Sequence, residues 1–222
     1  MYDEKEFNGP YTVLAFGLLY GFEDVLQDKR VSLSVPHLAE VTAVRVGGGS
    51  IESHLHLFIA PDGYDGKNIL FEQTDCSVSG LMPEHLIGAP NMHCAMKELF
   101  DYIGDSVIIA ESIAELKQYP FSVFKACAKR HGYTVKNAFA LPDVVTALRL
   151  YCALKDGGKS FFDMSLFELA DCLSDGRAVW VDVLADYDIY FDPDNGDRND
   201  TLTWALMYAK LFTKLLEKTL PF

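Results

Sequence analysis

The fold is decided by residues 37–59, which read HLAEVTAVRVGGGSIESHLHLFI. Residues 41–46 are rich in β-branched side chains, and three consecutive glycines separate them from a second run at 51–59. In the second run His54 and His56 fall on one face and Leu55 and Leu57 on the other, an alternation typical of a strand. Two such runs joined by a short glycine-rich link predict a β-hairpin.

The residues around this hairpin alternate between expected strands and helices. An apolar run at 11–16, bounded by Pro10, is typical of a buried strand, and we expect a loop from about Gly21 to His37. Further strands are expected at 107–110 and 138–141. Apolar spacing and capping signals indicate helices at 90–103, 113–130 with an interruption near Pro120, 143–155, 165–173 and 201–219. This order favours an α/β fold with a mixed sheet.

Length and composition are typical of one cytoplasmic domain. The chain has 222 residues, of which 50% are hydrophobic, enough for one substantial core. Its five cysteines are odd in number and form no CxxC pair, as expected for reduced thiols. No apolar run reaches the roughly 18 residues of a membrane span, and the first residues are charged, unlike a signal peptide. We therefore expect a cytoplasmic protein without a membrane partner.

The charge balance disfavours unassisted binding of nucleic acid. The chain carries 32 acidic and 19 basic residues, a net charge of −13. Affinity for a phosphate backbone comes largely from Lys and Arg, and no run of basic residues with interleaved aromatic residues is present in the sequence. The basic residues between Lys125 and Lys136 could form a small patch, which we interpret as an ordinary solvated face.

Four stretches, taken in order, carry a resemblance to a known family. Residues 37–46 resemble the family's second strand, I-I-E-I-G-A-V-R-V, and residues 78–90, VSGLMPEHLIGAP, resemble its T-G-I-T-x-E-x-L-x-x-A-P stretch. Residues 100–110 resemble the strand before its H-N-A-x-F-D motif. Residues 165–170 and 205–218 resemble its S-L-x-x-L-A helix and its closing helix. The chain therefore resembles the DnaQ-like, or DEDD-type, 3′–5′ exonucleases.

This resemblance implies a fold, a domain plan and a chemistry. The fold would be ribonuclease H-like: α/β, with a mixed five-stranded sheet flanked by helices. One domain would cover residues 1–222, with an acidic insertion at about 174–200 placed near the active-site rim. The family's chemistry is phosphodiester hydrolysis by two metal ions, which clustered carboxylates hold.

The family's catalytic positions are not ionisable in this sequence. Its first motif, D-x-E-T-T-G, aligns in either of two registers, and neither supplies a carboxylate. The second motif's acid and the last motif's base and acid are replaced as well. The replacing residues are Ala15 and Gly17, or Phe16 and Leu18 in the other register, followed by Leu116, Asn199 and Trp204. Carboxylates that could substitute from neighbouring positions are Glu111, Glu115 and Asp200.

Other possible metal-binding motifs in the sequence match their patterns poorly. Residues 192–197, DPDNGD, fail the calcium-loop pattern, which needs a glycine at the sixth position and a glutamate at the twelfth. His54 and His56 are too few for a metal site, and His93 and Cys94, adjacent on a helix, do not share a face. We expect no metal or other cofactor in the absence of the exonuclease chemistry.

Three functions remain open from the sequence. The first is a catalytically inactive exonuclease-like domain kept as a binding or assembly module, with a protein partner or a second copy. The alternative is a divergent 3′–5′ exonuclease acting on DNA or RNA ends with Mg²⁺ or Mn²⁺. A third is binding of an apolar ligand in a cleft lined by Phe16, Leu18, Leu116 and Trp204.

Overall fold

A computed structural model describes residues 10–24, 32–60, 81, 83–110, 120–140 and 201–219. In chain order its elements are β1 (Tyr11–Asp24), β2 (Ser32–Gly47), β3 (Ser50–Phe58), the 3₁₀ turn η2 (Pro83–Leu86), α2 (Met92–Ile103), β4 (Val107–Ala110), α3 (Pro120–Arg130), β5 (Ala138–Ala140) and α7 (Thr201–Thr219).

The strands form one mixed sheet in the order β3-β2-β1-β4-β5. β1, β2 and β3 are antiparallel neighbours, whereas β4 runs parallel to β1, and β5 parallel to β4. The expected hairpin is confirmed as β2–β3, with Gly48 and Gly49 in the turn at positive φ. The observed sheet therefore matches the mixed five-stranded sheet expected of a ribonuclease H-like fold.

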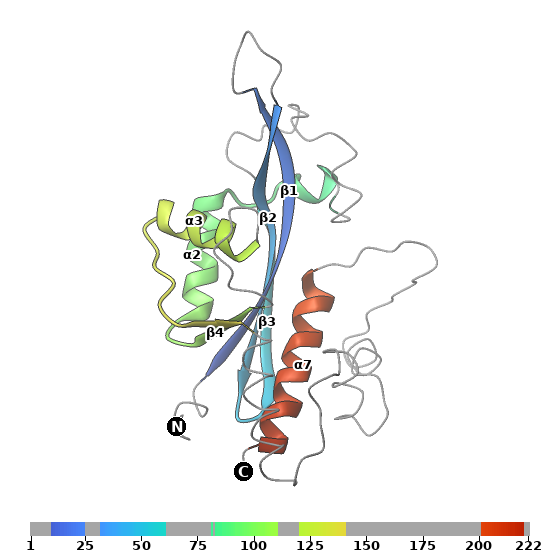
Figure 1. The fold of residues 1–222 in the computed structure, drawn as a ribbon, viewed down its shortest axis with the longest axis vertical. Coiled ribbons are helices and arrows are strands. Elements are labelled where there is room, and N and C mark those ends of the chain that lie inside the picture. The colour runs from blue at the N-terminus through green and yellow to red at the C-terminus, as the bar shows by residue number, and fades with distance from the viewer. Residues whose placement is uncertain are drawn as a thin grey trace, which may run out of the picture.

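Helices cover both faces of the sheet (Figure 1). α2 and α3 lie on one face, and α2 turns Met92, Met96, Leu99 and Ile103 inward at helical spacing. α7 lies on the other face, where the ring of Phe212 packs edge-on against Tyr11 of β1 at 4.9 Å. Burial of the Tyr11 side chain raises its pKa to about 12.

The prediction of a loop from about Gly21 to His37 is wrong at both ends of that range. β1 continues to Asp24 and β2 begins at Ser32, and the two strands pair over this whole length (Figure 1). Gly21 pairs with Val35, and Pro36 pairs with Tyr20. Pairing with a neighbouring strand outweighs the local preference of single residues, because it satisfies the backbone groups of both strands.

The remaining elements agree with expectation where the structure describes them. The final helix has the bounds expected, and the strand expected at 138–141 is present as β5 over Ala138–Ala140, the described part of that range. The helix at 90–103 starts at Met92 after its cap, Asn91, whose side chain accepts a hydrogen bond from the amide of Cys94. The helices at 143–155 and 165–173, the acidic segment at 174–200, and residues 113–119 lie outside the described residues. No helix within the described ranges is both long and apolar enough to cross a bilayer.

Candidate functional site

Two rows of side chains cross β3, β2 and β1 on the face that α7 covers. The ladder places His56 beside Thr42 and Thr42 beside Ala15. The next row holds Phe58, Glu40 and Gly17. Directly paired residues share a face of a sheet, so one contact with α7 fixes the side on which both rows lie.

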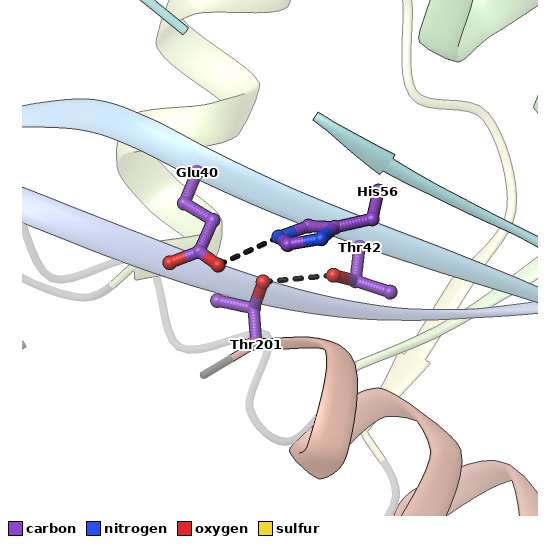
Figure 2. Close-up of polar contacts among 4 residues, drawn as sticks. All are labelled: Glu40, Thr42, His56 and Thr201. Atoms are coloured by element: carbon purple, nitrogen blue, oxygen red, sulfur yellow. Dashed lines mark hydrogen bonds and ion pairs between the residues drawn. The ribbon is translucent and has the colours of Figure 1, made fainter. Parts of the chain in front are cut away.

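That contact joins Thr42 of β2 to Thr201, the first residue of α7. Their hydroxyl oxygens are 2.8 Å apart, and both residues are buried (Figure 2). Each hydroxyl can donate or accept, so the pair satisfies two buried polar groups at once. The bond places the first turn of α7 over the two rows, and Ala15 and Gly17 therefore face this helix.

Glu40 is a buried carboxylate at the centre of this site. Its side chain is only 1% exposed, and Oε1 lies 2.7 Å from Nε2 of His56, whose side chain is 22% exposed (Figure 2). A carboxylate removed from water is costly unless it is paired, and the imidazole meets that need. In Figure 2 the carboxylate also points toward the first turn of α7, whose positive helix end favours an anion.

Apolar and aromatic groups enclose this pair. Leu19, Ala39, Leu81 and Leu86 form a small buried cluster beyond Glu40, with Phe58 packed against it. The Phe58 ring lies 4.9 Å from that of His56 and stacks on that of His85 at 5.3 Å. Enclosure of this kind lowers the local dielectric response, so the interaction between Glu40 and His56 is stronger than it would be in water.

Glu40 also occupies the space beside Gly17. A Cβ atom added at Gly17 would lie 2.8 Å from Oε2 and 2.9 Å from Cβ of Glu40, with Leu81 at 3.3 Å. The contact with Cβ of Glu40 cannot be relieved by rotating the end of the side chain. Position 17 therefore has no room for a side chain in this arrangement.

The two registers of the first motif point to opposite faces of β1. Phe16 stacks on Phe124 of α3 at 5.0 Å, and Leu18 belongs to the same core below α2 and α3. Ala15 and Gly17 face α7. The expected cleft lined jointly by Phe16, Leu18 and Trp204 is wrong, because Trp204 belongs to α7 on the other side of the sheet. The alternation of side chains along a strand separates them.

The other predicted site residues are only partly described. Trp204 is half-buried, and its ring lies 5.7 Å from that of Tyr208, one turn along α7. Leu116, Asn199, Glu111, Glu115 and Asp200 lie outside the described residues. Within the described ranges, no group of three or more His, Cys, Asp or Glu side chains is placed to hold a metal ion.

Sequence reasoning missed the role of Glu40. The residue was visible as a lone acid in an apolar, β-branched strand, a position where a carboxylate needs a partner. His56 was visible as well, but its pairing with Glu40 depends on the strand register. His54, which shares the strand face with His56, is exposed and lies opposite Val44.

Comparisons with known proteins identify the fold. No protein-family model and no curated protein matches the sequence. Solved structures do match. The nuclease domain of 3'hExo, a DEDDh family member bound to rAMP, is 11% identical at a TM-score of 0.56, over 98% of this chain and 95% of that one. A 3'-exonuclease that recognises the 3' end of a histone mRNA stem-loop is 11% identical at 0.55, over 95% and 83%.

A third similar structure is E. coli exonuclease I in complex with a 5cy-dT13 oligonucleotide. It is 12% identical at a TM-score of 0.55, over 95% of this chain. This chain spans about 40% of the length of the exonuclease I chain. At these identities the likeness establishes the fold, which is the ribonuclease H-like fold of the DEDD exonucleases.

Proposed function

We propose that this chain is a catalytically inactive exonuclease-like domain that serves as a binding or assembly module. The observation that carries the proposal is the placement of Glu40. Its carboxylate fills the space next to Gly17 and binds His56. The carboxyl group of this site is thus already bonded to a side chain of the protein.

The position of α7 supports one register of the first motif. In the two-metal mechanism the acids of the first and last motifs converge on the same ions. The last motif's acid is replaced by Trp204 on α7, so the first motif's acids must be replaced by residues that face α7. These are Ala15 and Gly17, and neither offers an oxygen ligand for a hard cation.

The replacement has a physical consequence for the unliganded fold. Clustered carboxylates repel one another unless a cation is present. Here β1 contributes an Ala and a Gly to that face, and the buried acid on β2 has an imidazole partner. The site can therefore remain closed and stable without metal, which suits a domain kept for its surface.

The partner of such a module is proposed to be a protein, either a different chain or a second copy. The net charge of −13 disfavours a polyanion, although the similar structures include complexes with an oligonucleotide and with an RNA stem-loop. Light scattering of the purified chain over a range of concentrations separates self-association from a need for another partner.

One observation favours the alternative, a divergent metal-dependent exonuclease. Glu40 is an acid next to the first turn of α7, which begins directly after Asp200 in sequence. With Glu111 or Glu115, which follow β4 closely, these acids could form a rebuilt metal site. Such a site would need Glu40 to leave His56.

Titration with Mn²⁺, followed by the relaxation of backbone amide signals, distinguishes the two functions. Mn²⁺ is paramagnetic and broadens the signals of nearby nuclei. The proposal predicts that the amides of Gly17, Glu40 and Thr201 keep their line widths relative to those of β5, on the far edge of the sheet. Selective broadening of these three signals at substoichiometric Mn²⁺ would refute the loss of the metal site.

A further inference from the structure

Two histidines meet on the opposite face of the sheet from Glu40. His93 lies in the first turn of α2 and is exposed, and His131 directly follows α3 and is half-buried. Their ring centres are 5.8 Å apart, with the ring planes at 49°. The two side chains come from different helices, so helix packing brings them together rather than sequence spacing.

His131 has an unusual polar atom. Its Nε2 is buried and makes no hydrogen bond within the described part of the structure. Buried polar nitrogen atoms are nearly always satisfied by a protein group, a water molecule or an ion. The Nε2 of His131 is therefore available to a ligand, and the exposed imidazole of His93 lies beside its ring.

The backbone that carries His131 is fixed by the end of α3. The amide of Tyr133 donates to the carbonyl of Ala128 at 2.9 Å, and the amide of Gly132 donates to that of Lys129 at 3.2 Å. Gly132 has φ 88°. This is the Schellman arrangement, in which a glycine in the left-handed region closes the last turn of a helix.

Aromatic stacking also fixes α2 relative to α3. Phe100, two turns after His93 on α2, stacks on Tyr133 at 4.5 Å and 13° and on Phe124 at 5.9 Å and 15°. Residues seven positions apart share a helix face, so His93 and Phe100 both point toward α3. The two imidazoles are thus held on a rigid support, which reduces the entropy lost on binding a ligand.

We propose that His93 and His131 form a binding site for a divalent transition-metal ion such as Zn²⁺, Ni²⁺ or Cu²⁺. Imidazole nitrogen is a preferred ligand of these ions. With metal–nitrogen distances of about 2.0–2.1 Å and tetrahedral angles, two ring centres on one ion would be about 5.3 Å apart. The observed 5.8 Å differs from this by an amount that a small rotation of the exposed His93 ring can remove.

The coordination would be open. Within the described ranges no third His, Cys, Asp or Glu joins this pair as a ligand, so water or a partner's side chain would complete the shell. Two imidazoles alone are too few for a closed site, here as for His54 and His56, but in this pair the buried Nε2 of His131 makes no hydrogen bond within the described residues. An open shell gives a weaker site than the closed, four-ligand sites of structural zinc. It also leaves positions through which a bound ion could bridge this chain to another protein. The proposal is independent of the state of Glu40.

Calorimetric titration of the tag-free protein with Zn²⁺ and with Ni²⁺ tests the proposal. The parent should bind one ion, and His93→Asn and His131→Asn should each lose at least tenfold in affinity. His54→Asn, which removes an exposed histidine on β3, and Cys94→Ser, which removes the exposed thiol next to His93, should bind as the parent does. Circular dichroism checks that each variant is folded.

Two results would overturn the site. One is a parent that binds neither ion more tightly than the double variant His93→Asn/His131→Asn. The other is binding that Cys94→Ser removes and the histidine variants do not, which would assign the ion to the thiol. If His131→Asn unfolds the chain, the affinity of His93→Asn alone tests the site. His93 is exposed and lies in a regular helix, so this variant should fold.

Discussion

His56→Ala is expected to lower the free energy of unfolding by about 1–3 kcal/mol, the usual cost of removing one hydrogen-bond partner of a buried polar group. The variant would leave the carboxylate of Glu40, which is 1% exposed, without its imidazole partner in an apolar enclosure. Chemical denaturation followed by circular dichroism measures the difference. His54→Ala is the matched control: the same substitution two residues away on the same strand, at an exposed position, should change stability by about 0.5 kcal/mol or less.

A substitution of Glu40, the other residue of the pair, turns the experiment into a double-mutant cycle. If the cost arises from the lost contact between His56 and the buried carboxyl group, Glu40→Gln should recover part of the loss in the His56→Ala background. A His56→Ala variant as stable as His54→Ala would show that the pair contributes nothing to folding. It would also remove the reason to regard the Glu40 carboxylate as held in place by His56.

Gly17→Asp is expected to destabilise the fold by more than about 3 kcal/mol, beyond the usual range of overpacking alone. The new Cβ would overlap both Oε2 and Cβ of Glu40, and the new carboxylate would lie beside a buried one. Gly17→Ala introduces the same overlap of Cβ with Glu40 but no charge, and it should lower the free energy of unfolding by about 1–3 kcal/mol.

Gly48→Ala is the control for the glycine substitutions. Gly48 has φ 55° and open space around its Cβ, so its cost is backbone strain alone, about 1–2 kcal/mol. A Gly17→Asp variant as stable as the parent would mean that Glu40 moves aside readily. Position 17 could then carry an acid, and the present packing would not oppose a metal site.

The fold was predictable because its signals are local or ordered along the chain. The β2–β3 hairpin follows from alternation around a glycine turn, and the last helix from apolar spacing that runs without interruption to Thr219. The parallel strands follow from the resemblance to the exonucleases. The length of β1 and β2 was missed because Gly21 and Pro36 suggest breaks when they are considered without their partners.

The site was less predictable because it depends on register. Whether Ala15 or Phe16 faces α7 follows from strand alternation only after one contact, Thr42 with Thr201, has fixed the face. The ladder shifts between Gly17 and Leu18, so a count along the strands from the far end would place Glu40 on the wrong side. His93 and His131 are joined only through the packing of two helices.

We propose that this exonuclease fold does not perform metal-dependent hydrolysis. The most direct measurement is incubation of the tag-free protein with single- and double-stranded DNA and RNA in Mg²⁺ and in Mn²⁺, with a chelator and the Glu40→Gln variant as controls. We expect no product above the chelated reaction, because hydrolysis needs several carboxylates on two ions and the β1 residues that face the start of α7, Ala15 and Gly17, supply none. Product that the chelator abolishes and that Glu40→Gln, Glu111→Gln or Asp200→Asn removes would contradict it.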